Sequence, residues 1–285
     1  MLTVIRTLQL EKQIDDFKLG PIELTIEPGT ITALVGNNGS GKSTLMKLMM
    51  NLVKSDHGKI YLFDQEIAPA NEKWKTNVGY QPQATVGYAP FTGETLKQMI
   101  APLYPTWDQQ LFNDVVTELN ISLKKPFNKL SPGAQQKLSF ALTIARNTPL
   151  LILDEPTAHL DIPSKKLIID RLVQWMEGGE RSIIIASHQV EDIKKLADYL
   201  VILHHGQMIG HYEKGDLSEQ YARFWLKEPL TNHDIPHIIA RDELTIVSNH
   251  AAATEAYLNE HRIEYINHEQ IDLEEIITFL LTNKH

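Results

Sequence analysis

A glycine-rich segment near the N-terminus of this 285-residue chain has the residue types and spacing that hold phosphate groups. It reads Gly36, Asn37, Asn38, Gly39, Ser40, Gly41, Lys42, Ser43 and Thr44, and Gly36–Ser43 match the pattern G-x4-G-K-[ST] completely. Glycines let successive backbone N–H groups turn inward on a phosphate, and a following helix N-terminus adds a partial positive charge. In this pattern the lysine reaches the β- and γ-phosphates, and the serine hydroxyl is a Mg²⁺ ligand. The segment therefore predicts binding of a nucleotide with Mg²⁺.

Two adjacent carboxylates, Asp154 and Glu155, follow the apolar run Leu150–Leu153. Burying a charge is costly unless it is paired or coordinates a metal, and a strand end beside a phosphate site supplies both conditions. Asp154 suits the coordination sphere of Mg²⁺, and Glu155 suits a general base that activates water for attack on the γ-phosphate. The alternative is a polar strand end that simply faces water, which the phosphate-binding segment in the same chain disfavours.

Apolar runs beside these residues predict the elements that position them. Ile31–Val35 is expected to be a buried strand that leads into the glycine-rich turn and then into a helix over about 43–52. Leu150–Leu153 and Ile183–Ser187 are expected to be parallel strands, and Leu200–Leu203 one arm of a hairpin that closes the sheet. Short strands that alternate with longer helical patterns indicate an α/β fold with crossover helices.

Two regions depart from this alternation. Between about residues 84 and 148, prolines and aromatic residues separate helical patterns, so we expect a mainly helical insert. After Lys227 the sequence becomes acidic and rich in histidine, which predicts a main domain over 1–227 and a small C-terminal unit over 228–285. Its expected elements are a strand at Leu244–Ser248, a helix at Ala251–Glu260, a strand at Ile263–Ile266 and a helix at Leu273–Thr282. The histidines of this unit lack tight ligand spacing, and we interpret them as solvated rather than metal-binding.

The composition narrows the classes of partner. The formal net charge is −9 and no long run of Lys or Arg occurs, so a nucleic-acid-binding surface is not expected. The chain has no cysteine, which excludes disulfides and thiolate sites. No stretch reaches the roughly 18 apolar residues of a membrane span, and the N-terminus lacks the regions of a signal peptide. We therefore expect that the chain does not enter a membrane itself.

These features resemble the ATPase subunits of ATP-binding-cassette (ABC) transporters over about residues 1–225. Gly36–Thr44 is similar to that family's Walker A segment and Leu150–Glu155 to its Walker B segment. The other landmarks stand in the family's order: Gln83 at the Q-loop position with Gln81 as the alternative, Leu130–Lys137 at the signature motif, Ala158–Asp161 at the D-loop, and His188 as the switch histidine. The resemblance implies an α/β P-loop NTPase (RecA-like) core with an antiparallel β subdomain, a helical insert and a small C-terminal α+β appendage.

The resemblance also implies a mechanism shared between two chains. Two ATPase subunits, identical or different, are expected to dock head to tail around two ATP molecules. Ser131 and Gly133 of one chain would contact the γ-phosphate held by the other, helped by a helix N-terminus. His188 would contact the γ-phosphate while Glu155 acts as the base. The expected metal ligands are Ser43, Asp154 and Gln83, with Gln83 linking the metal site to the helical insert.

The sequence departs from the family pattern at two sites. In the signature motif, Pro132 replaces a glycine and therefore offers no backbone N–H, and Ala134 replaces a glutamine. We expect contact with the γ-phosphate to survive with altered strength. The family usually stacks an aromatic ring on adenine before the phosphate-binding loop, and here Ile14 aligns best, with Phe17 nearby.

The segment Leu103–Asp108 and the short C-terminal region are similar to the separate-chain ATPases of bacterial ABC-2-type exporters. The resemblance thus implies a cytoplasmic motor, peripheral at the inner face of the cell membrane, that couples ATP-driven dimer closure to export through a separate integral membrane permease. A non-transport ABC ATPase acting on a macromolecular complex is the alternative. A GTPase is disfavoured because Asn128-Lys129 is followed by Leu130-Ser131 and not by the base-reading pattern Asn-Lys-x-Asp.

Overall fold

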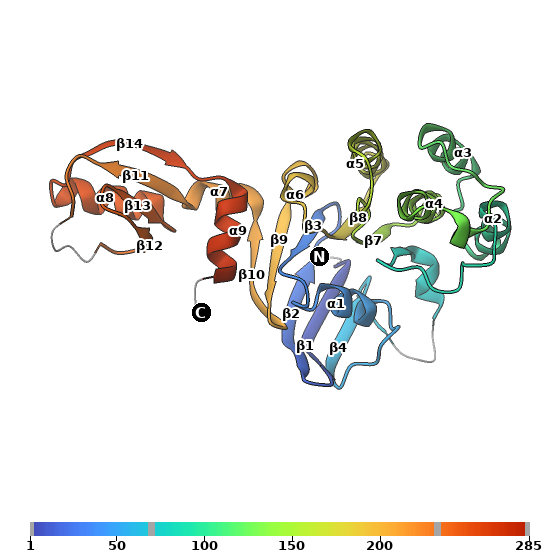
Figure 1. Cartoon of the computed structure of the whole chain (residues 1–285). Helices are drawn as coiled ribbons and strands as arrows, with labels where there is room; N and C mark the ends of the chain where they lie inside the picture. The colour runs from blue at the N-terminus through green and yellow to red at the C-terminus, as the bar shows by residue number, and fades with distance from the viewer. Residues whose placement is uncertain (1–2, 68–71, 231–234, 283–285) are drawn as a thin grey trace.

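A six-stranded sheet forms the centre of the larger part of the molecule (Figure 1). The computed structural model describes residues 3–67, 72–230 and 235–282. The strand order is β10-β9-β3-β8-β7-β6. The bounds are β3 (Ile31–Val35), β6 (Val78–Gln81), β7 (Leu150–Asp154), β8 (Ser182–Ala186), β9 (Tyr199–His204) and β10 (Gln207–Glu213). Strands β3, β7 and β8 are buried along their whole length, which explains their continuous apolar sequences.

Parallel pairing brings the functional segments to one edge of this sheet. Strand β8 pairs in parallel with both β3 and β7, and its Ala186 lies opposite Leu34 on one side and Asp154 on the other. The glycine-rich loop follows β3, the two carboxylates end β7, and His188 follows β8. All three segments therefore leave the sheet at the same edge. At the far side, β9 and β10 form the antiparallel hairpin that the sequence predicts.

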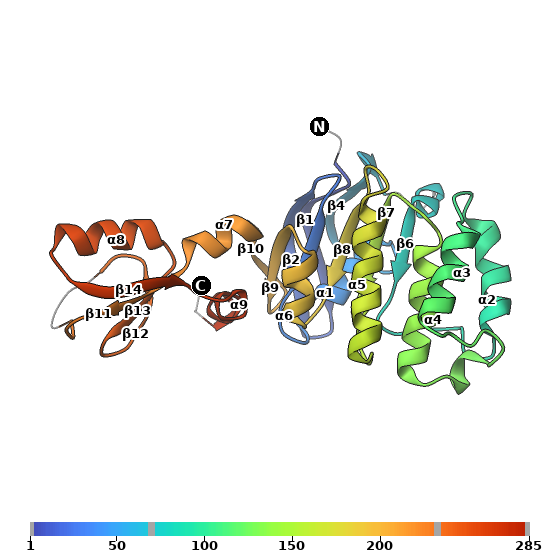
Figure 2. The same ribbon diagram turned by 90° about the horizontal axis from the view of Figure 1, so that it is seen from above.

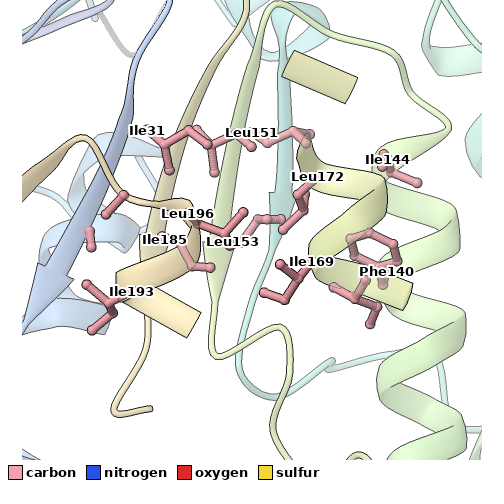
Figure 3. Packing of buried hydrophobic residues seen from close by; sticks show 14 of the residues in the cluster. Ile31, Phe140, Ile144, Leu151, Leu153, Ile169, Leu172, Ile185, Ile193 and Leu196 are labelled. Atoms are coloured by element: carbon pink, nitrogen blue, oxygen red, sulfur yellow. The ribbon is translucent and has the colours of Figure 1, made fainter. Parts of the chain in front are cut away.

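Helices cover one face of the sheet and an antiparallel sheet covers the other. Helices α4 (Pro132–Ile144), α5 (Ile162–Met176) and α6 (Val190–Leu196) pack their apolar side chains on Leu151, Leu153 and Ile185, as Figure 3 shows. The opposite face packs on helix α1 (Lys42–Met49) and on a sheet of order β2-β1-β4-β5. The strands of that sheet are β1 (Ile5–Ile14), β2 (Phe17–Ile26), β4 (His57–Leu62) and β5 (Gln65–Glu66).

The region expected to be a helical insert contains α2 (Gly93–Ile100), α3 (Gln109–Glu118) and α4, which lie together at one end of the molecule (Figure 2). Short 3-10 helices occur at Lys73–Asn77, Ala101–Leu103 and Phe127–Lys129. Thr92 and Asp108 cap α2 and α3 by accepting hydrogen bonds from backbone N–H groups three residues on. The predicted α/β core, antiparallel sheet and helical insert are confirmed.

The C-terminal unit has its own four-stranded sheet, of order β12-β13-β11-β14. Its elements are α7 (Lys214–Gln220), β11 (Ala222–Leu226), β12 (Ile238–Arg241), β13 (Thr245–Ser248), α8 (Ala251–Glu260), β14 (Tyr265–Gln270) and α9 (Leu273–Thr282). Strand β11 is central in this sheet and pairs with β13 and β14, so the sheet begins before the domain boundary expected at 227/228. Strand β14 begins two residues later than expected and continues through polar, exposed residues that give no apolar run.

Within the described ranges, no helix combines the length and apolar character that a bilayer crossing requires.

Candidate functional site

The glycine-rich loop connects β3 to α1 in a conformation that requires its glycines. A Cβ on Gly36 would lie 2.1 Å from the carbonyl oxygen of Leu203, and one on Gly41, at φ +109°, would lie 2.6 Å from Leu19 Cδ1. Ser40, inside the loop, is buried and its hydroxyl has no hydrogen-bond partner. The loop thus presents backbone and hydroxyl groups at the start of a helix, where an anion is favoured.

Lys42 lies at the centre of this loop. Its ammonium group donates hydrogen bonds to the carbonyl oxygens of Gly36 at 2.6 Å and Asn37 at 3.1 Å. Burial lowers the pKa of Lys42, while the nearby charges of Glu155 and Asp154 act in the opposite direction. The group is therefore a partly desolvated cation, and such a cation interacts strongly with phosphate oxygens.

Asp154 ends β7 facing the loop. Its side chain is 1% exposed, and its Oδ1 atom has no hydrogen-bond partner. Burial raises the pKa of Asp154, and a hydrogen bond from Ser43 opposes this increase. Burial and the charge of Asp154 raise the pKa of Tyr80 to about 12. A buried carboxylate with an unpaired oxygen, beside a hydroxyl, fits a Mg²⁺ ion, which binds through one or two protein oxygens together with substrate phosphates.

Glu155 is held by contacts of its backbone N–H, its carbonyl oxygen and its carboxylate. It has a left-handed conformation, with φ 53°. Its N–H donates to the carbonyl oxygen of Ala186 at 2.9 Å, and its own carbonyl oxygen accepts a hydrogen bond from Gln136 Nε2 at 2.6 Å. Its carboxylate oxygen lies 2.8 Å from His188 Nδ1. When His188 carries its proton on Nδ1, it donates a hydrogen bond to this carboxylate and its Nε2 atom is left without a proton. The His188 side chain is 59% exposed.

A cavity of about 460 Å³ joins these groups. Its walls include Asn38–Thr44, Asp154, Glu155, Gln83 and Phe17. Gln83, the preferred Q-loop residue, lies in this wall, whereas the alternative, Gln81, is fully buried inside β6 with both of its amide atoms unpartnered.

Of the two candidates for contact with the base, only Phe17 lines this cavity. Ile14 pairs with Phe17 across the tight β1–β2 turn, and it is not among the residues of the cavity wall. The aromatic ring is therefore the better placed of the two to stack on a base.

The signature segment lies elsewhere on the surface. Ser131 caps α4, with its hydroxyl accepting from the N–H of Ala134 at 3.3 Å, and Pro132 occupies the first turn. A Cβ on Gly133 would lie 2.7 Å from the carbonyl oxygen of His159. This segment and the D-loop, with Asp161, line a second cavity of about 500 Å³ that shares no wall residue with the first. A single chain does not bring the signature segment to the phosphate-binding loop.

Asp161 caps α5 by accepting a hydrogen bond from the N–H of Ser164 at 2.8 Å. Hydrogen bonds from Ser164 lower the pKa of Asp161. The carboxylate of the D-loop is thus already engaged in fixing the start of a helix.

Two buried contacts near Glu155 are absent from the sequence-based predictions. The first is the bond from Gln136, which ties the signature helix α4 to the backbone of Glu155. The second joins Thr157 Oγ1 to Asp192 Oδ2 at 2.6 Å and ties the segment after Glu155 to helix α6. Both donors are common polar residues without a distinctive spacing, and only their burial in the fold indicates a role.

A sequence model for the family described as ABC transporter matches residues 19–158. The chain is 31% identical over 221 residues to the ABC transporter ATP-binding protein YtrB of Bacillus subtilis (strain 168), covering 77% of this chain and 75% of that one. It is 32% identical over 198 residues to the energy-coupling factor transporter ATP-binding protein EcfA1 of Ureaplasma parvum, covering 66% of each.

Solved structures show the same fold. One is described as an ATP-binding subunit of an ABC transporter, and it matches with a TM-score of 0.69 at 24% identity, over 76% of this chain and 93% of that one. Another is a dimeric post-hydrolysis state of the ATP-binding cassette MJ0796 with ADP and Pi, with a TM-score of 0.64 at 18% identity, over 73% of this chain and 98% of that one.

Proposed function

The chain belongs to the family of ABC transporter ATP-binding proteins, and from this premise we propose that it is the motor subunit of a transporter, driving a separate membrane permease. It is a nucleotide-binding ATPase with the P-loop fold of that family. The observation that carries the proposal is the cavity in which the phosphate-binding loop meets Asp154, Glu155 and Gln83.

Each group in the cavity suits one part of phosphoryl transfer to water. Lys42 and the loop N–H groups bind the β- and γ-phosphates and hold the terminal phosphate for in-line attack. Glu155 accepts a proton from the attacking water, and its backbone contacts fix the carboxylate in place. His188 is not a wall residue of this cavity, but Glu155 orients it through Nδ1, and it presents its other nitrogen to the γ-phosphate.

The metal site that we propose consists of Ser43, Asp154 and Gln83. These residues would hold a Mg²⁺ ion, which would neutralise charge that develops on the phosphates. The unpaired oxygen of Asp154 supports this assignment because a buried carboxylate needs a partner of opposite charge.

The separation of the two cavities supports a dimer as the working unit. Ser131 and Gly133 lie in the second cavity, so they meet the γ-phosphate only if another chain supplies them. Ile162, directly after Asp161, is 83% exposed and is therefore accessible to another ATPase subunit. The second subunit is either a copy of this chain or a related ATPase.

Exposed apolar side chains on and near the helical insert supply a surface for the permease. Val86 is 91% exposed three residues after Gln83, and Met99 and Leu103 are exposed at the end of α2. Gln83 lines the ATP cavity, so displacement of its segment couples the cavity to this surface. Through this contact the motor is peripheral at the inner face of the cell membrane. We propose export as the direction, because Leu103–Asp108 and the short C-terminal unit resemble those of bacterial exporter ATPases.

Site-specific crosslinking tests the assignment to a transporter. The chain has no native cysteine, so Met99→Cys carries a single thiol for a photoactivatable maleimide. In membranes of producing cells, we expect the labelled Met99 variant to form an adduct with a multi-spanning membrane protein. Val173→Cys is the matched control, because Val173 is similarly exposed on α5, outside the insert.

An adduct with a protein that spans the membrane several times, found at Met99 and absent at Val173, supports the proposal. Adducts only with a large macromolecular complex that has no membrane protein, from a variant with normal ATP hydrolysis, would contradict it. That result would favour the non-transport ABC ATPase.

A further inference from the structure

The last helix, α9, belongs to the ATPase core and not to the core of the C-terminal unit. Leu273, Ile276, Ile277 and Leu280 are part of the same apolar cluster as Ile193 and Leu196 of α6. One face of the C-terminal sheet and α8 form a separate apolar cluster around Phe224, while Val247 of β13 belongs to the cluster that contains α9. In both views, α9 lies between that sheet and strand β9 of the ATPase (Figures 1 and 2). The chain therefore leaves the ATPase, forms a small sheet, and returns to pack on α6.

Polar contacts hold α9 to helix α6 on one side and to strand β11 on the other. Lys194 Nζ of α6 donates to Asp272 at 2.8 Å and to Glu191 at 2.9 Å. The hydrogen bonds to Asp272 and Glu191 raise the pKa of Lys194. On the other side, Arg223 of β11 donates to Glu275 of α9. Asp272, the residue before α9, thus forms an ion pair with the ATPase, and Glu275 of α9 forms another with the C-terminal sheet.

The same helix forms a wall next to the proposed switch histidine. Glu274, Ile277 and Thr278 line a cavity of about 320 Å³ together with His188 and Asn37–Asn38 of the phosphate-binding loop. No other element of the C-terminal unit lines this cavity within the described residues.

Helix α6 needs such support. It has seven residues, begins at Val190 immediately after the switch segment, and has no side-chain cap at its N-terminus. A helix this short is marginal alone and is stable only through tertiary contacts. Those contacts include the central sheet and helix α5, the Thr157–Asp192 hydrogen bond, and α9 on the outer side. The position of α6 sets where the preceding two residues, His188 and Gln189, lie.

We propose that α9 positions the switch histidine by holding helix α6, so that the C-terminal unit controls the rate of ATP turnover. This inference rests on the role of His188 in turnover stated above. Asp272 is a positioning residue in this account: it lines neither cavity beside the glycine-rich loop, and it acts through Lys194 and α6.

Charge reversal tests the proposal in the full chain. Asp272→Lys places two ammonium groups together, and we expect kcat for ATP to fall about two- to fivefold, the scale of an exposed ion pair. KM for ATP should stay the same, because the phosphate-binding loop is unchanged. The double variant Lys194→Glu/Asp272→Lys restores an opposite-charge pair and should recover most of the rate.

Glu264→Lys is the matched control. Glu264 forms an ion pair with Lys227 at 2.6 Å within the C-terminal unit, away from α6, so its reversal should leave kcat unchanged. A merely structural effect would lower the rate in the control as well, or would not be rescued by the double variant. An unchanged kcat in Asp272→Lys, or a loss that the double variant does not restore, overturns the proposal.

A parallel measurement on His188→Ala separates this inference from the function on which it rests. If His188→Ala loses most of its turnover and Asp272→Lys keeps a normal rate, only the role of α9 is refuted. A normal rate in His188→Ala refutes the role of the histidine, and with it the premise of the inference.

Discussion

Asp154 is a residue at which the proposed metal-binding role and the stability of the fold oppose each other. Its carboxylate is buried, and one of its oxygens is unpartnered. Because burial raises its pKa, the folded state holds the proton of Asp154 more tightly than the unfolded state does. The stabilising contribution of the protonated form is therefore present at low pH and is lost as the pH rises through the raised pKa.

Asp154→Asn is thus expected to raise the free energy of unfolding at neutral pH without Mg²⁺, by about 1–3 kcal/mol, the cost of an unsatisfied buried group. The gain should shrink as the pH is lowered toward the ordinary pKa of aspartate. Chemical denaturation at several pH values measures it, and Mg²⁺-dependent hydrolysis should be lost at the same time.

Asp56→Asn serves as a control, because the fold lowers the pKa of Asp56 and raises that of Asp154. A hydrogen bond from the N–H of Gln13, with a further one from Lys12, lowers the pKa of Asp56, so removing its charge should not stabilise the protein. An Asp154 variant that is less stable than the parent chain at neutral pH would contradict this account.

Residue type and spacing were sufficient to predict that the glycine-rich loop and the two carboxylates lie side by side. The choice between Gln83 and Gln81, and between Phe17 and Ile14, depends on which way each side chain points. That direction depends on where β6 ends and on the tight turn between β1 and β2, and neither is visible in the local sequence.

At the scale of elements, helix α4 explains how the signature segment tolerates a proline. Pro132 is the first residue of α4, a position where the fixed φ of proline suits the helix and its N–H would be unpaired in any case. Ser131 caps the same turn by bonding the N–H of Ala134. Pro132 therefore favours the helix, and it also removes one N–H donor from the surface that is expected to face a γ-phosphate.

Pro132→Gly should separate these two effects. We expect a lower free energy of unfolding, by about 0.5–1 kcal/mol, because glycine increases the freedom of the unfolded chain. We also expect a higher rate of ATP hydrolysis, since an additional N–H becomes available at the helix N-terminus.

Thermal unfolding and steady-state hydrolysis measure the two quantities. Pro102→Gly, in the short helix Ala101–Leu103, controls for the general effect of losing a proline. If the rate of Pro132→Gly stayed at the parental value or fell, the missing N–H would not limit turnover.

Among the elements, the buried strands were the easiest to predict. Strands β3, β7 and β8 are apolar throughout, and each lies within one residue of its expected bounds. Strands β11 and β12 were not foreseen, because β11 alternates buried and half-buried residues and β12 is short and half-buried. The C-terminal sheet therefore begins at Ala222, earlier in the chain than the boundary expected at 227/228.

At the scale of the whole molecule, the fold places the two halves of the proposed ATP site in separate cavities. The first cavity holds the loop, the carboxylates and Gln83, and the second holds the signature segment and the D-loop. A second chain is the simplest source of the missing half. The return of α9 to the ATPase was beyond prediction, because its apolar face alone does not say which core it joins.

The hydrolysis rate and ATP affinity of Glu155→Gln test the central claim most directly. The amide keeps the shape of the side chain but cannot accept a proton from water, so turnover should fall by about a hundredfold or more. ATP affinity should remain close to that of the parent chain, because Lys42 and the loop are unchanged. A rate within a few-fold of the parent, with ATP still bound, would contradict the assignment of Glu155 as the base and the account built on it.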